Sequence, residues 1–278
     1  MEPVGPGNSS PMDAEGESSA AADIPNTLAD GIAKLVLDQF AALTNGLTSQ
    51  FARRKVLAGI VMTRYESADG LEGAQVIAVT TGTKCIGGEY MSDSGLALND
   101  CHAEIIARRC LRRFLFDQIE LHLDPAAAGM SVLVPRNNGA GFVLKSGVRF
   151  HLYVSSAPCG DARIFAPKET ESEAVEDRHP NRMARGLLRT KIESGEGTIP
   201  ITKSTVELQT WDGVMSGERL LTMCCSDKVA RWNVLGIQGR EKYHFSISSS
   251  YVACSTYRYL IRVKRSILKM YSVYNLAL

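Results

Sequence analysis

The sequence has no long apolar run, almost no net charge and no pattern typical of a secretion signal. No uninterrupted apolar stretch among its 278 residues approaches the roughly 20 that a membrane-spanning helix needs, so no membrane partner is expected. The net charge is +1, so a nucleic-acid partner has to be inferred from local clusters of basic residues. The first 22 residues are polar and acidic, without the basic and apolar regions of a signal peptide.

The cysteines also lack a regular pattern. There are seven, an odd number at irregular spacing, which argues against a disulfide framework and favours free or metal-bound thiols in a reducing compartment. Most buried cysteines behave as small apolar residues. We expect that role for Cys85, Cys101, Cys110, Cys254 and one of the adjacent pair Cys224 and Cys225.

The composition divides the chain into three parts. Residues 1–23 are rich in Gly, Pro, Ser, Ala and acidic residues, which predicts a disordered tail. Apolar residues recur at helical spacing in 24–51 and 218–237, and β-rich runs cover 56–62, 76–81, 150–156 and 206–211. The first two β-rich runs suggest a hairpin, and residues 124–141 resemble a loop. No internal repeat is visible.

The most informative stretch is Asn99–Arg109, in which His102 and Glu104 open a helix-like run. A histidine can bind a metal ion and a glutamate can move a proton. Glu104 is too close to His102 in the chain to be a comfortable second ligand to the same ion. The H-x-E pattern is weak alone, and it becomes informative only if thiolates join it.

Cys159 supplies one such thiolate, since it follows a predicted buried strand and Pro158, which would begin a helix. Zinc suits one imidazole and two thiolates, with a fourth position left for a water whose pKa falls to about 7. H-x-E with P-C-x-x-C and a glutamate that is not a ligand is the signature of zinc nucleobase deaminases. Here no second cysteine follows Cys159, so the third ligand has to come from Cys224 or Cys225.

Five motifs make the chain resemble the adenosine deaminase domain of double-stranded RNA editases, of their B-type branch. They are GTKC from Gly82, LNDCHAE from Leu98, SAPCGDAR from Ser156, KIESGEGTIP from Lys191 and WDGV from Trp211. The resemblance implies zinc-dependent hydrolytic deamination of adenosine to inosine in double-stranded RNA, with Cys225 as the third ligand after His102 and Cys159. It also implies an α/β fold of the cytidine-deaminase-like type, in which helices flank a mixed sheet and the metal lies at helix N-termini.

The resemblance assigns further residues. Glu196, between two glycines, would fill the space left by a flipped-out base. A buried inositol hexakisphosphate would be held by Asn99, Arg108, Arg109, Lys228, Arg231 and Trp232. Burying such basic residues without a polyanion costs several kcal/mol per ion. RNA contacts fall on Lys55, Val56, Thr83, Lys84 and Arg163, and on the basic cluster Arg178, Arg182, Arg185, Arg189 and Lys191.

The resemblance covers residues 28–239. We therefore expect an incomplete deaminase domain at 24–239 and a divergent tail at 240–278, without part of the domain's C-terminal region and half of the phosphate cage. Such a chain would be unstable and weakly active or inactive by itself. The alternatives are a non-catalytic RNA-binding or dominant-negative fragment, and a deaminase of tRNA or free adenosine. Nuclear residence, including the nucleolus, is expected from the family, with the cytoplasm as second choice and a homodimer as a further expectation.

Overall fold

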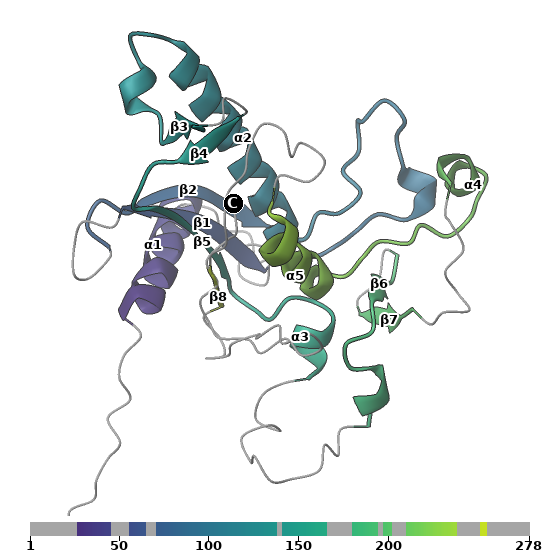
Figure 1. Ribbon diagram of the computed structural model, residues 1–278. Helices are drawn as coiled ribbons and strands as arrows, with labels where there is room; N and C mark the ends of the chain where they lie inside the picture. Colours follow the sequence, from purple (N-terminus) through teal and green to yellow (C-terminus); the bar gives the residue numbers. More distant parts are fainter. Residues whose placement is uncertain are drawn as a thin grey trace, which may run out of the picture.

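A four-stranded sheet forms the centre of the protein (Figure 1). The structure, a computed structural model, describes residues 27–45, 56–64, 71–137, 141–165, 180–193, 197–201, 210–237 and 251–254. The strand order is β2-β1-β5-β8, with β1 at Leu57–Arg64, β2 at Gln75–Thr81, β5 at Val148–Val154 and β8 at Tyr251–Cys254. β1 runs antiparallel to β2 and β5, whereas β8 runs parallel to β5, so the sheet is mixed.

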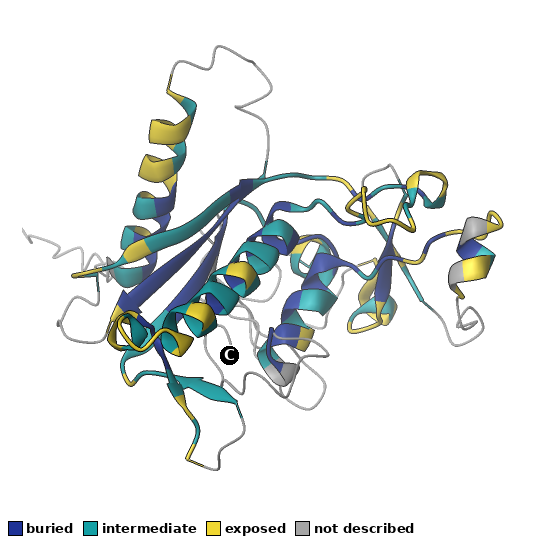
Figure 2. Ribbon diagram, turned by 90° about the horizontal axis from the view of Figure 1, so that it is seen from above, coloured by how far each residue is buried: buried dark blue, intermediate teal, exposed yellow. Residues whose placement is uncertain are grey.

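Helices cover both faces of this sheet (Figure 2). Successive side chains of a strand point to opposite faces. Ala58, Ile60 and Met62 of β1 therefore pack in the core that includes α2 (Ala103–Leu123) and α5 (Cys225–Leu235). Leu57 and Val61 pack against α1, which runs from Thr27 to Thr44. The predicted α/β class is confirmed, and so are the predicted hairpin of β1 and β2 and the buried strand β5.

Helix α2 begins where the sequence predicts, directly after His102, which is its N-cap residue. Its buried stripe includes Ile105, Leu111 and Leu115, because these positions face the sheet. None of the helices in the described part of the chain is both long enough and apolar enough to cross a membrane.

The prediction of a loop over 124–141 was wrong in part. It contains a 3₁₀ turn, η3 (Ala128–Met130), and strand β3 (Leu133–Pro135), which pairs with β4 (Phe142–Leu144). Gln118 on α2 holds this segment: its carbonyl accepts from Ser131 Oγ at 2.7 Å, and its side-chain oxygen accepts from Val132 N at 3.0 Å. Such a tertiary contact leaves no periodic signal in a three-residue strand.

Two predicted helix starts also differ from the structure. Pro158 does not begin a helix: α3 covers Asp161–Ile164, after Gly160 with a φ of 104° that no helix adopts. The helical pattern of 218–237 begins only at Cys225, because Thr222 and Cys224 bond to another strand. Thr222 O accepts from Lys191 N at 2.7 Å, and Cys224 N donates to Arg189 O at 2.9 Å.

The remaining elements lie beyond α5, to its right in Figure 1. They are η2 (Gly88–Tyr90), η5 (Arg182–Ala184), the hairpin of β6 (Arg189–Lys191) with β7 (Thr198–Pro200), and α4 (Trp211–Met215). Most of the strand predicted at 206–211 lies outside the described residues, and Trp211 begins α4 instead. In the stretch expected to be a divergent tail, residues 251–254 form β8 and the rest lies outside the described residues.

Candidate active site

Three separate elements bring His102, Cys159 and Cys225 together. Their ligand atoms all lie within 4.8 Å of one another. His102 caps α2, Cys159 lies in the turn between β5 and α3, and Cys225 is the first residue of α5. Tetrahedral zinc ligands at roughly 2.0–2.3 Å from the metal lie about 3.5–4 Å apart. The group therefore has the donor types and the size for one zinc ion.

The two cysteines lie in direct contact. Cys225 N donates a hydrogen bond to Cys159 Sγ at 3.3 Å, and both side chains are buried. Hydrogen bonds from the Cys225 thiol and from His102, together with the charge of Lys191, lower the pKa of Cys159 to about 4, although burial opposes this. Burial, the hydrogen bond with Cys159 and the charge of Glu104 raise the pKa of Cys225. The pair therefore holds a thiolate, the form that binds metal.

Glu104 lies in the first turn of α2 and is only 2% exposed. The charge of Glu104 helps to raise the pKa of Cys225, so the carboxylate lies near that thiol. The three-residue metal group does not include Glu104. A buried carboxylate beside a candidate metal site, and outside its set of ligands, suits proton transfer.

The structure distinguishes the adjacent cysteines Cys224 and Cys225. Cys224 Sγ donates to Asp227 Oδ2 at 3.0 Å and accepts from Asp227 N at 3.4 Å. Burial and then Asp227 raise the pKa of the Cys224 thiol well above its ordinary value. Cys224 thus caps α5 as a neutral thiol, and Cys225 faces the metal group.

Asp100 lies within the LNDCHAE motif, but the sequence analysis assigned it no role. It is 3% exposed, and its carboxylate accepts hydrogen bonds from Lys191 Nζ at 2.7 and 2.8 Å and from Lys228 Nζ. Its Oδ1 also accepts from the backbone N of His102 at 3.2 Å. Burial would raise the pKa of Asp100, but the two lysines outweigh it and lower the pKa. The one signal in the sequence is a carboxylate two residues before a helix-starting histidine, where such side chains often bond the backbone.

Lys191 lies in the interior rather than on the basic surface to which the sequence pattern assigned it. It is 2% exposed. Burial would lower its pKa, but the neighbouring Cys225, Asp100 and Cys159 outweigh burial and raise it. Lys191 thus carries a positive charge between the Asp100 carboxylate and the thiols of the candidate metal group.

Three of the six residues predicted to bind a polyphosphate, Asn99, Arg109 and Lys228, lie next to Asp100. Arg109 Nη1 donates to Asp100 O at 2.7 Å, and Lys228 pairs with its carboxylate. Thr222 Oγ1 donates to Asn99 Oδ1 at 3.4 Å. The Arg108 guanidinium lies 5.3 Å from the centre of the Trp232 ring, and Arg108 donates to Ile237 O. Arg231 is exposed.

The residues predicted to contact RNA differ in exposure. Lys84, Arg163 and Arg182 are exposed, whereas Val56, Thr83 and Arg185 are half-buried. Arg189 is 4% exposed and pairs with Asp161 at 2.7 Å, and Arg185 stacks on Phe165 at 4.0 Å. The burial of Arg189 favours a structural role. Lys55, Arg178 and Glu196 lie outside the described residues.

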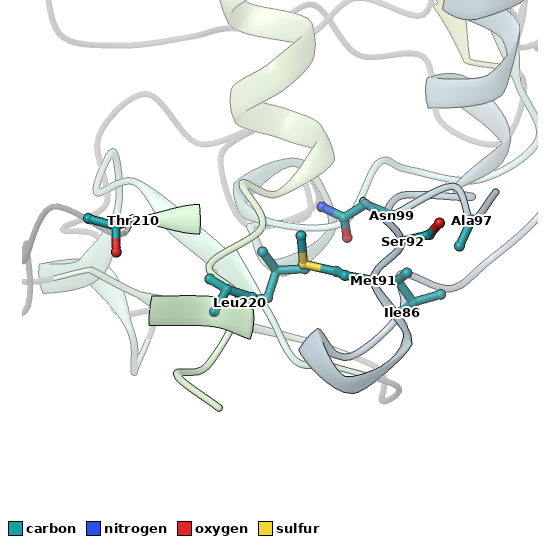
Figure 3. Close-up of a pocket in the computed structure, with 8 residues that line it drawn as sticks. Ile86, Met91, Ser92, Ala97, Asn99, Thr210 and Leu220 are labelled. Carbon is teal, nitrogen blue, oxygen red and sulfur yellow. The ribbon is translucent and has the colours of Figure 1, made fainter. Parts of the chain in front are cut away.

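A separate hollow of about 240 Å³ lies between the loop before α2 and the segment around α4. Figure 3 shows Ile86, Met91 and Asn99 on one side of it, and Thr210 and Leu220 on the other. Its lining includes Asn99 but neither Glu104 nor any of the three candidate metal ligands. The candidate active site therefore rests on the side-chain group and not on this hollow.

A sequence profile of the adenosine-deaminase (editase) domain matches residues 78–251. The chain belongs to this family, which confirms the resemblance seen in its motifs. It is 55% identical over 80% of its length to the double-stranded RNA-specific editase Adar of Drosophila melanogaster, and it covers 32% of that protein. It is 50% identical over 80% of its length to the double-stranded RNA-specific editase B2 of Mus musculus, and it covers 29% of that protein.

The chain is also similar to a deaminase named for a different RNA. It is 35% identical over 75% of its length to the tRNA-specific adenosine deaminase 1 of Drosophila melanogaster, of which it covers 49%. The chain thus spans about a third of the two editases and half of the tRNA deaminase.

Proposed function

We propose that the chain catalyses zinc-dependent hydrolytic deamination of adenosine to inosine in double-stranded RNA. The observation that carries this proposal is the convergence of His102, Cys159 and Cys225 within 4.8 Å, with the buried Glu104 beside them. Family membership supports adenosine as the reacting base, and the mixed sheet with helices on both faces suits a cytidine-deaminase-like fold.

The chain's own residues divide the work between binding and proton transfer. His102, Cys159 and Cys225 hold the zinc ion, which when bound supplies a Lewis acid that lowers the pKa of water to about 7. Glu104 takes a proton from the attacking water and gives it to the adenine ring, and it then takes a second proton from the hydroxyl group added at C6 and gives it to the departing ammonia. The burial of Glu104 keeps bulk water from competing for that proton.

An adenosine inside a duplex cannot reach a buried site, so the base has to be flipped out of the helix at a cost of a few kcal/mol. We assign Glu196 to the space that the base leaves. The exposed side chains Lys84, Arg163 and Arg182 are the best candidates for phosphate contacts, and the half-buried Val56, Thr83 and Arg185 for contacts near the base. Lys55 and Arg178, which lie outside the described residues, stay predictions.

We further propose inositol hexakisphosphate as the anion beside Asp100. One carboxylate here faces two lysines, and Arg109 lies next to them. The surplus positive charge is partly or fully buried, and a polyanion would offset the cost of that burial. Asn99, Arg108, Arg109, Lys228, Arg231 and Trp232 are the proposed ligands. Nuclear residence and a homodimer stay predictions.

The test is an inosine assay on the purified chain with four substrates: duplex RNA, the matching single strand, tRNA and free adenosine. We expect a low yield of inosine from the duplex, because an incomplete domain predicts weak activity, and none from Glu104→Gln, which keeps the size of the side chain but cannot take up the proton. Zinc content is measured in both proteins. A chain that holds zinc and binds duplex RNA, but forms no inosine, would be the non-catalytic fragment. Inosine from tRNA or adenosine alone would assign a different substrate.

A further inference from the structure

The two metal-binding cysteines are not linked by a short motif. In deaminases with P-C-x-x-C, the chain itself holds the two thiolates three residues apart. In this chain the residue three after Cys159 is Ala162, and Cys225 lies 66 residues after Cys159. Two thiolates on separate elements need a non-covalent connection to keep them at a fixed spacing.

Ser226, the residue after Cys225, makes that connection. Its hydroxyl donates to the carbonyl oxygen of Cys159 at 2.9 Å and accepts from the backbone N of Ala162 at 3.1 Å. Its own backbone N donates to the same Cys159 carbonyl at 2.9 Å. The side chain is 5% exposed, so water competes little for these hydrogen bonds.

Gly160 allows this close approach. A Cβ atom at Gly160 would lie 2.4 Å from Cys224 Sγ and 3.1 Å from Ser226 Oγ. The turn after Cys159 is therefore in van der Waals contact with the start of α5. Ser226 bonds on both sides of this glycine, to Cys159 before it and to Ala162 after it.

We propose that Ser226 is a positioning residue of the metal site, whose hydroxyl joins the Cys159 turn to α5 and so sets the spacing of the two thiolates. The inference rests on the proposed zinc site. In a P-C-x-x-C motif, a second cysteine at position 162 would be held near Cys159 by the chain itself. Here the hydrogen bonds of Ser226 hold the second cysteine, Cys225, near Cys159 instead. A residue of this kind orients the ligands, and its loss typically weakens metal binding about 10–100-fold.

The experiment compares the full chain with Ser226→Ala, which removes the hydroxyl, and Ser226→Thr, which keeps it. Ser131→Ala is the matched control: Ser131 is also buried, and its hydroxyl also donates to a backbone carbonyl and accepts from a backbone N, but just before β3. Zinc affinity is measured by competition with a chromophoric chelator. The cobalt(II) spectrum of each protein reports the geometry of the thiolate ligands.

Ser226→Ala should bind zinc about 10–100-fold more weakly and show a changed cobalt spectrum. Ser226→Thr and Ser131→Ala should stay within a few-fold of the parent chain. Equal zinc affinity in Ser226→Ala and the parent would overturn the proposal and leave the proposed function intact. A parent chain that binds no zinc would overturn both, and an equal loss in Ser131→Ala would show a general effect of stability instead.

Amide hydrogen exchange in the parent chain tests the same contact without a variant, which matters if Ser226→Ala does not fold. The N–H of Ala162 lies in the first turn of α3, where amides have no acceptor within the helix. Its donation to Ser226 predicts slow exchange. Exchange as fast as that of an open amide would overturn the proposal.

Discussion

The Lys191 ammonium group lies 2.7 Å from the Asp100 carboxylate, and both side chains are almost fully buried, at 2% and 4% exposure. Lys191 belongs to β6, and Asp100 stands just before α2, so this ion pair attaches the β6–β7 hairpin to the helix that carries His102 and Glu104. Cys159 and Cys225 also raise the pKa of Lys191 and so favour its charged form. The pair therefore links the thiols of the candidate metal group electrostatically to the start of α2.

Replacing Asp100 with Asn should strongly destabilise the fold. The substitution leaves two lysines without their counter-charge, and breaking a buried ion pair on one side costs about 3–5 kcal/mol. Urea unfolding measures the change in the free energy of unfolding. Asp38→Asn, which breaks the exposed pair with Lys34 on α1, is the control and should cost less than about 1 kcal/mol. Equal changes in the free energy of unfolding for the two substitutions would contradict a structural role for the ion pairs of Asp100 with Lys191 and Lys228.

His151 should make the fold sensitive to mild acid. Its Nε2 lies 2.8 Å from Thr63 Oγ1, and burial with the charge of Arg149 lowers its pKa from 6.5 to about 4. The unfolded chain therefore binds a proton below pH 6.5 that the folded chain takes up only near pH 4. The free energy of unfolding should fall by about 2 kcal/mol for this group between pH 7 and pH 5.

The measurement is urea unfolding at several pH values, on the parent chain and on His151→Gln. The variant should lose this part of the pH dependence, and an unchanged slope between pH 7 and pH 5 would argue against a buried neutral histidine.

Gly82→Ala should displace the start of α2. A Cβ atom at Gly82 would lie 1.9 Å from the carbonyl oxygen of Cys101, and Gly82 O accepts from Ala103 N at 3.0 Å. Overpacking of this kind costs about 1–3 kcal/mol and should also weaken zinc binding, because His102 lies between these two backbone contacts. Gly129→Ala, where a Cβ atom has no neighbour within 4 Å, should change stability by less than about 0.5 kcal/mol. Thermal unfolding and zinc titration of both variants decide the question.

Substitution of the adjacent cysteines should have different effects on metal content. Cys225→Ala removes a ligand of the group, so the purified protein should contain little zinc. Cys224→Ala removes a hydrogen bond to Asp227 and should keep about one zinc ion per chain, with some loss of stability. Elemental analysis measures the zinc content. If Cys224→Ala were the variant without zinc, the assignment of the third ligand would be reversed.

The sequence predicted those parts of the fold and site that depend on periodicity or on a motif. The apolar runs of β1 and β5 and the stripe of α2 are long enough to show their period, and His102, Glu104 and Cys159 each lie in a recognisable context. Spacing alone left Cys224 and Cys225 open, and the family resemblance chose Cys225. The structure explains why Cys225 and not Cys224 is the candidate ligand, because the Cys224 thiol donates a hydrogen bond to Asp227.

The contacts that the sequence did not predict join residues far apart in the chain. Asp100 and Lys191 are separated by 91 positions, and Ser226 is separated from Ala162 by 64. A lysine in a basic segment normally indicates a solvated surface, so the burial of Lys191 could not be predicted from the sequence. The late start of α5 has a similar cause, since Thr222 and Cys224 bond to the ends of β6.

We propose that His102, Cys159, Cys225 and Glu104 form a hydrolytic deaminase site. The most direct test is mass spectrometry of the nucleosides from a duplex RNA, after incubation with the zinc-loaded chain in water enriched in the heavy oxygen isotope. We expect inosine that carries the heavy oxygen, and none from Glu104→Gln. Unchanged adenosine with the zinc-loaded parent chain, or equal inosine with Glu104→Gln, would contradict it.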